Sequence, residues 1–117
     1  MIHKLLLAGL LLISTSDVHG INLDKVRWGT VSQHTEGQVI SVINSKEVYK
    51  NISYYQTIIK EGVKQGTAKY AKLMRNATAL YRSTLGKAGI PLIVEIGGVN
   101  TKLHKTEDVT KKIISLL

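Results

Sequence analysis

Residues 38–50, QVISVINSKEVYK, decide the fold of this chain because an apolar strand pattern passes there directly into a helix pattern. Gln38–Ile43 (QVISVI) is rich in β-branched residues, which is typical of a buried strand. Asn44 stands three residues before Glu47, the spacing of a capping box that satisfies unpaired backbone N–H groups at a helix start. The sequence therefore predicts a strand over 38–43 and a helix that begins after Asn44.

The segment that follows predicts a helical hairpin, with helices over about 45–61 and 67–87. In the first helix, apolar residues recur at steps of four and three, close to a coiled-coil period; they are Val48, Ile52, Tyr55, Ile59 and Val63. Gly62 and Gly66 interrupt the pattern and predict the connecting turn. Gly86, Gly89 and Pro91 predict the end of the second helix. We therefore expect residues 45–88 to form a hairpin arm.

The flanking sequence predicts a small sheet and a last helix, which makes the expected fold α+β. Strand patterns cover about 25–31 and 92–96, and Gly97–Gly98 predicts a tight turn to a further strand over about 99–103. Thr106 is a suitable N-cap for a C-terminal helix over about 106–116, with Glu107 and Asp108 in its first turn. Trp28 is expected to be a strand residue that covers the sheet.

The N-terminus carries the three-part pattern of a secretory signal peptide. One lysine, Lys4, precedes the apolar run Leu5–Ile13, and the polar stretch Ser14–Gly20 follows it. Nine apolar residues are too few for a membrane anchor, which needs about 20. We expect residues 1–20 to be the signal peptide, with cleavage after Gly20, although Ser14 and Ser16 offer an earlier position. Residues 21–117 would then be a single domain in the periplasm or an equivalent space.

The positive net charge and the lack of cysteine indicate which kind of partner the protein binds. The chain has a net charge of +8 and no cysteine, so neither a disulfide nor acylation at a cysteine is available. Residues 46–87 hold nine lysines and arginines against Glu47 and Glu61. Acidic partners are therefore expected at the hairpin, and we expect client or anion binding there by Lys46, Lys50, Tyr54, Lys60, Lys64, Lys69, Lys72, Arg75 and Arg82.

Catalytic and metal-binding patterns are weak. His34 and His104 lie in polar segments without a second ligand three or four residues away. Glu95 interrupts an apolar strand, and we expect it either on the solvated face or in an ion pair with a lysine or arginine across a subunit boundary. Because no nucleophile, base and orienting group can be placed together, we expect no enzyme activity, no cofactor and no metal.

The five tyrosines all lie on the expected hairpin. Packing is the expected role of Tyr55, Tyr70 and Tyr81. Tyr49 and Tyr54 lie nearer the edge of the apolar stripe, where an aromatic ring among lysines contacts either the core or a bound client.

Three segments together resemble the OmpH/Skp family of periplasmic chaperones: QVISVINSKEVY, IPLIVEIGGV and EDVTKKIISLL. The resemblance runs from about Gln38 to Leu117 and contains no catalytic motif. It implies a homotrimer with a central body and basic coiled-coil arms that bind unfolded outer-membrane proteins. The implied body residues are Val39, Ile40, Val42, Ile43, Leu92, Ile93 and Val94. The arms here are much shorter than those of the family, and residues 21–37 lie outside its pattern.

Two functions follow as expectations. The first is a holdase-type chaperone that binds unfolded outer-membrane or other exported polypeptides without ATP during outer-membrane biogenesis. The alternative is a basic envelope scaffold protein that binds anionic lipid or lipopolysaccharide surfaces through the hairpin. Nucleic-acid binding suits the charge but conflicts with export.

Overall fold

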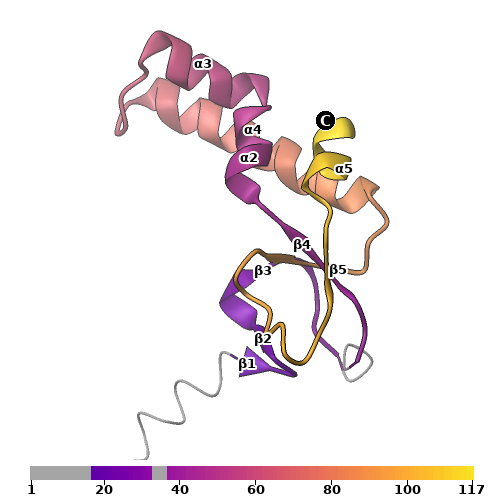
Figure 1. The fold of residues 1–117 in the computed structure, drawn as a ribbon. Helices are drawn as coiled ribbons and strands as arrows, with labels where there is room; N and C mark the ends of the chain where they lie inside the picture. Colours follow the sequence, from indigo (N-terminus) through magenta and orange to yellow (C-terminus); the bar gives the residue numbers. More distant parts are fainter. Residues whose placement is uncertain (1–16, 33–36) are drawn as a thin grey trace, which may run out of the picture. The chain divides into compact units, whose positions relative to one another are not determined.

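The computed structural model describes residues 17–32 and 37–117 (Figure 1). The expected signal peptide therefore lies outside the described residues up to Ser16, as does His34. The fold is α+β, as the sequence predicts. The chain divides into two compact units, which we describe separately: a sheet unit, up to Val42 and from Pro91 to Glu107, and a helical unit, Ile43–Ile90 with Asp108–Leu117.

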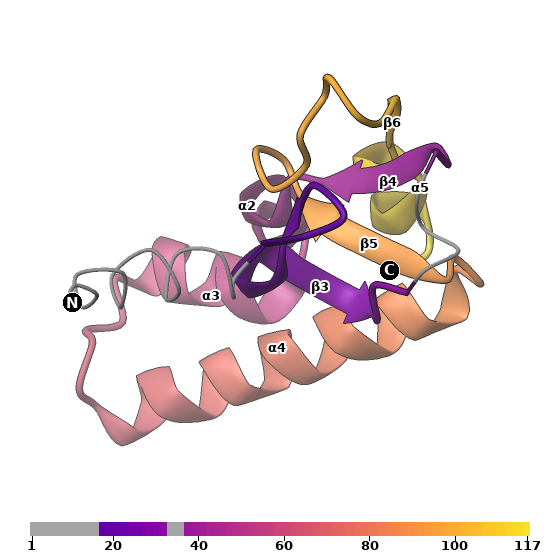
Figure 2. The same ribbon diagram turned by 90° about the horizontal axis from the view of Figure 1, so that it is seen from below.

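Strands dominate the sheet unit. A two-stranded hairpin pairs β1 (Asp17–Val18) with β2 (Ile21–Asn22), and a short 3-10 helix, η1 (Leu23–Lys25), follows. The larger sheet has the order β3-β5-β4-β6; its strands are β3 (Val26–Gly29), β4 (Ile40–Ile43), β5 (Leu92–Glu95) and β6 (Thr106–Asp108). Figure 2 shows β5 between β3 and β4. The strands expected over 25–31, 38–43 and 92–96 are thus present in shorter form.

The centre of the sheet unit is a small apolar core. Ile21, Ile40 and Val94 are buried there, and the partly buried side chains of Val26 and Leu92 are among those that pack against them. A β-bulge at Arg27 shifts the pairing of β3 with β5. The bulge is accompanied by an ion pair in which Arg27 Nε donates to Glu95 Oε1 at 2.9 Å. The sequence predicted a solvated position or an ion pair across a subunit boundary for Glu95, whereas this ion pair lies within one chain.

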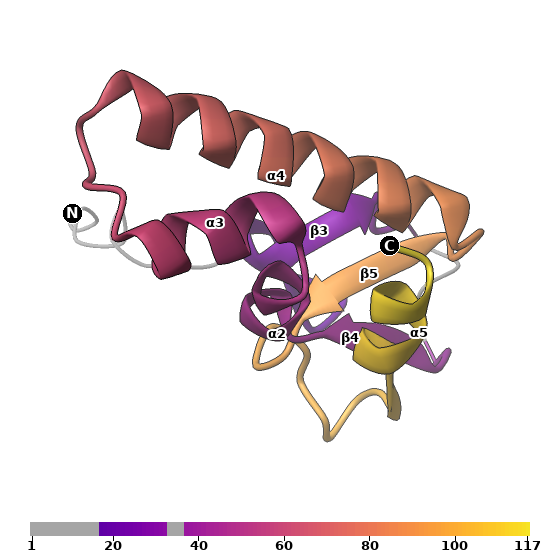
Figure 3. The ribbon, with the colours of Figure 1, turned by 90° about the horizontal axis from the view of Figure 1, so that it is seen from above.

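Four helices dominate the helical unit. They are α2 (Ser45–Lys50), α3 (Ser53–Glu61), α4 (Ala68–Lys87) and α5 (Thr110–Ser115). α3 and α4 lie side by side (Figure 3), joined by a turn that begins at Gly62 in the left-handed conformation. Their shared interior is apolar: among its buried residues are Val48, Ile52, Ile58, Ala77, Tyr81, Leu85 and Ile113.

The helix expected over 45–61 is broken in two, which is a correction. Asn51 ends α2, and its side-chain amide donates to the Glu47 carbonyl at 2.9 Å, competing with helical hydrogen bonding. Ile52 is extended, and its side chain is buried in the interior at 1% exposure. Because α3 starts again at Ser53, the helical phase is reset there.

The C-terminal segment also differs from expectation. No strand forms over 99–103, because Val99 makes an isolated bridge to Ile21 and residues 101–103 turn. Thr106 is not an N-cap but the first residue of β6, and the last helix begins at Thr110. Asp108 accepts hydrogen bonds at Oδ1 from the Thr110 backbone N–H at 2.9 Å and hydroxyl at 2.6 Å. Asp108 therefore ends the strand and orients the helix start.

Candidate functional site

Side-chain caps fix the starts of α2 and α4, whereas α3 begins after Ile52 without one. Asn44 Oδ1 accepts from the Glu47 backbone N–H at 3.3 Å, which is half of the expected capping box. The Asn44 backbone N–H donates instead to the Thr110 hydroxyl at 2.9 Å. Thr67 caps α4 by accepting from the Tyr70 N–H at 3.2 Å and donating to the Lys64 carbonyl at 2.7 Å. These bonds hold the two ends of the hairpin.

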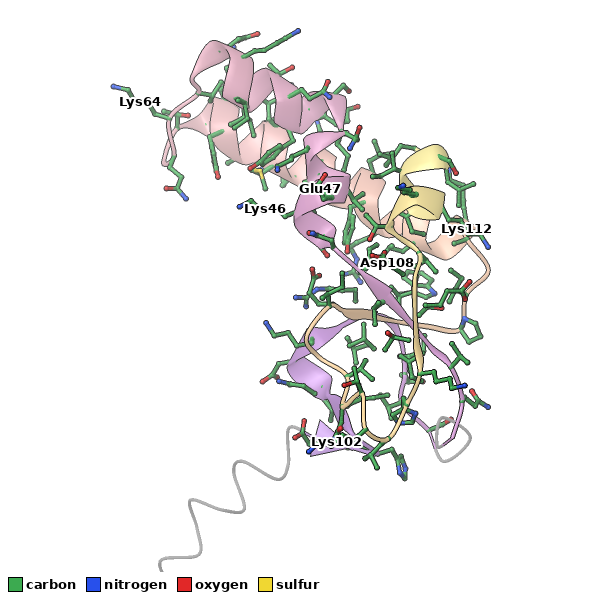
Figure 4. All side chains as sticks on the ribbon, in the orientation of Figure 1. Lys46, Glu47, Lys64, Lys102, Asp108 and Lys112 are labelled. Atoms are coloured by element: carbon green, nitrogen blue, oxygen red, sulfur yellow. The ribbon has the colours of Figure 1, made fainter. Side chains whose placement is uncertain are left out.

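Every residue predicted to bind a client or anion is exposed. Lys46 and Lys50 belong to α2, and Tyr54 and Lys60 belong to α3. Lys64 lies in the connection between α3 and α4, where Figure 4 shows its side chain pointing outward. The other four lie on α4: Lys69, Lys72, Arg75 and Arg82. The structure therefore spreads these cations over the whole hairpin surface instead of gathering them at one point.

The two carboxylates of the hairpin leave most of this positive charge uncompensated. Glu47 Oε1 lies 3.2 Å from Lys50 Nζ, and Glu61 Oε1 lies 2.5 Å from Lys69 Nζ. All four side chains are about half exposed, so each pair contributes little to stability, roughly 0–1 kcal/mol. With nine basic residues against two acidic ones over 46–87, the hairpin keeps a strong positive potential.

A shallow groove on α2 and α3 combines this charge with apolar surface. Its volume is about 630 Å³, and its lining is mostly apolar; it is formed by Lys50, Tyr55, Gln56, Ile59 and Lys60. Ile59 is 65% exposed, although its spacing predicts a buried position. The break before Ser53 is the reason, because it turns Ile58 into the interior at 5% exposure and leaves Ile59 outside.

A second groove lies on α4. Its volume is about 640 Å³ and its lining is again mostly apolar, with Arg75 and Arg82 among its side chains. The other lining residues are Ala71, Met74, Asn76, Thr78 and Ala79. The two grooves share one chemistry: an apolar floor with cations beside it, open to solvent.

Three tyrosines form an aromatic cluster inside the hairpin. The ring of Tyr49 lies 4.9 Å from that of Tyr81 and 6.0 Å from that of Tyr55, measured between centroids. The Tyr49 hydroxyl donates to Thr78 Oγ1 at 3.1 Å, and the Tyr81 hydroxyl is hydrogen-bonded to Ser45 Oγ. Tyr49 therefore packs, as do Tyr55 and Tyr81, whereas Tyr54 is 39% exposed.

The residues that the resemblance assigns to an oligomer body mostly fill the interior of one chain. Ile40, Val42, Ile43, Ile93 and Val94 are all buried. Leu92 is partly buried, and Val39 is 58% exposed. Of this set, Val39 is thus the residue with the largest free surface. Ile96 and Leu103 add exposed apolar side chains to the same unit.

Among the described residues, no group of three or more histidine, aspartate or glutamate side chains could hold a metal ion. His104 is buried, with both ring nitrogens engaged by backbone carbonyls: Nδ1 lies 3.2 Å from Gln38 O, and Nε2 lies 2.6 Å from His19 O. Its role here is therefore to hold loops together.

Sequence reasoning missed the grooves, and with them Gln56 and the exposed position of Ile59. The available signal was Asn51, a residue that favours helix ends and turns. Because the spacing of apolar residues continues past Asn51, periodicity alone predicted one unbroken helix.

No family model, curated protein or solved structure matches this chain. Within residues 17–32 and 37–117, no helix is both long and apolar enough to cross a membrane.

Proposed function

We propose that this chain is an exported, short-armed chaperone of the OmpH/Skp kind, which holds unfolded outer-membrane or other exported polypeptides in the periplasm without ATP. The observation that carries the proposal is the groove on α2 and α3, which exposed Ile59 lines together with Lys50 and Lys60. The order of elements supports it too, because a strand, a helical hairpin, a second strand and a C-terminal helix follow one another as in the family.

The chemistry of the groove suits an unfolded polypeptide. Such a chain exposes apolar side chains that a folded protein buries, and these side chains gain free energy by covering Ile59 and Tyr55. The neighbouring lysines attract acidic segments from a distance and accelerate association at low salt. Neither contribution requires a defined client sequence, which is what a holdase needs.

The lengths of α3 and α4 limit the ways in which the hairpin could hold a client. α4 has 20 residues and is about 30 Å long, whereas α3 has nine residues and reaches about 14 Å. Arms this short favour binding on open surface grooves over enclosure in a deep cavity. We therefore expect several copies of the protein to coat one client.

The first test measures aggregation of an unfolded outer-membrane barrel protein, diluted from urea at low salt with and without the purified protein. We expect suppression that weakens as salt rises. The double variant Lys50→Glu, Lys60→Glu should bind the client about tenfold more weakly, which corresponds to roughly 1.4 kcal/mol. The matched control, Lys102→Glu with Lys105→Glu, makes the same change in net charge at exposed residues of the sheet unit. No suppression at several-fold molar excess would refute the proposal.

The second test separates a chaperone from an envelope scaffold. Ile59→Ser removes the exposed apolar side chain and leaves every charge in place. We expect it to weaken client binding several-fold, since about 1 kcal/mol of apolar burial is lost. It should leave cosedimentation with anionic vesicles unchanged. If the protein sediments with anionic but not neutral vesicles and Ile59→Ser has no effect on clients, the scaffold function is favoured instead.

A further inference from the structure

Residues 17–20, which would be lost with a signal peptide that ends at Gly20, are part of the folded sheet unit. β1 and β2 pair antiparallel, with Asp17 opposite Asn22 and Val18 opposite Ile21. His19 and Gly20 form the turn between them, with φ values of 54° and 80°. The first half of a hairpin therefore lies before the expected cleavage position.

The C-terminal part of the sheet unit holds this turn in place. His104 Nε2 donates to the His19 carbonyl at 2.6 Å, and the Asn100 backbone N–H donates to the Gly20 carbonyl at 2.8 Å. The packing is close as well, because a Cβ added at Gly20 would lie 2.8 Å from Leu103 Cδ1. Two hydrogen bonds and a close contact thus fix residues 19 and 20 from a distant part of the chain.

Cleavage after Gly20 would place a new charged amino group on a buried residue. Ile21 has 0% exposure, belongs to the core of the sheet unit and bridges to Val99. After the cut, this ammonium would either stay buried at high cost or draw the core residue Ile21 toward water. The same cut would separate β1 from β2 and remove the acceptor of His104 Nε2. The fold therefore disfavours the Gly20–Ile21 bond as a processing site.

We propose that processing occurs at the Ser16–Asp17 bond. The proposal rests on the export proposed above. Ser14 and Ser16 lie outside the described residues and contribute by their identity alone: they are small residues at the third and first positions before this bond, as signal peptidase requires. Hydrolysis consumes one water, leaves a carboxylate on Ser16 and leaves an ammonium on Asp17. Asp17 is exposed, so this ammonium stays in water and the whole β1–β2 hairpin remains in the mature chain.

The test is the N-terminal sequence and intact mass of the full-length chain, expressed in a Gram-negative host and purified from the periplasm. We expect the first residue to be Asp17. A chain that begins at Ile21, or at any other residue after processing, overturns this bond while leaving export intact. A chain that keeps Met1 and is not exported overturns both proposals, so the two failures are distinguishable.

A matched pair of variants tests the bond directly. Ser16→Lys places a large charged residue immediately before the proposed bond, and we expect the unprocessed chain to accumulate. Val18→Lys adds the same charge two residues later, at the third position before the Gly20–Ile21 bond. It should still be processed at Asp17. The opposite pattern, in which Val18→Lys blocks processing and Ser16→Lys does not, would overturn the assignment.

Discussion

At the scale of single residues, His104 connects segments that are far apart in the sequence. Its two ring nitrogens face the carbonyl oxygens of Gln38 and His19. His104→Phe should leave both carbonyls without this partner and lower the free energy of unfolding by about 1–3 kcal/mol. Urea denaturation measures this loss. Lys102→Ala, at a neighbouring exposed turn residue, serves as the control and should change stability by less than about 0.5 kcal/mol.

Gly29, by contrast, has a local and steric role. It ends β3 with φ of 83°, and a Cβ there would lie 1.9 Å from the Pro91 carbonyl oxygen. Gly29→Ala should therefore destabilise the protein by about 2–4 kcal/mol, since backbone must move in addition to the strain of the positive φ. Gly66 has nearly the same φ, 88°, with no atom within 4 Å of the added Cβ. Gly66→Ala should cost about 1 kcal/mol, and equal losses in thermal unfolding would contradict the steric explanation.

At the scale of elements, two adjacent residues of α3 point to different sides of the helix, so one contributes to stability and the other is free for binding. Ile58 is 5% exposed and Ile59 is 65% exposed, although they are adjacent and chemically identical. Ile58→Ala should lower the free energy of unfolding by about 2–4 kcal/mol, because it leaves a cavity between α3 and α4. Ile59→Ala should cost less than about 0.5 kcal/mol. Chemical denaturation of the two variants gives the comparison, and a larger loss at Ile59 would mean that α3 has the phase of one unbroken helix.

At the scale of the whole molecule, assembly is the property to measure. The resemblance predicts a trimer, and exposed Val39 on the sheet unit is the expected body residue with the most free surface. Light scattering across a range of salt should give the mass of three chains. Val39→Glu should shift this mass toward one chain, because a charge cannot be buried cheaply at an interface. Ile59→Ser, on the hairpin, is the control and should leave the mass unchanged. A wild-type monomer at all salts would remove the proposed shared body.

The amino-acid sequence was enough to predict the α+β class, the strand over 38–43, the start of a helix after Asn44 and the helix over 67–87. These features depend on local causes: β-branched runs, caps and helix-ending glycines act within a few residues. It also determined that Lys50, Lys60, Arg75 and their neighbours would be exposed, because charged side chains on a short hairpin remain in water.

Positions that depend on distant partners follow only from the packing of the folded chain. Ile52 lies at the break between α2 and α3 with its side chain buried in the interior, whereas Ile59 is exposed and lines the groove. Val99 pairs with Ile21 instead of continuing a strand beside β5, and Asp17–Gly20 join the fold through Asn100 and His104. Helical or strand periodicity reports only on neighbours along the chain, whereas the contacts of residues 19–21 join positions more than seventy residues apart, and their pairing depends on how the core closes.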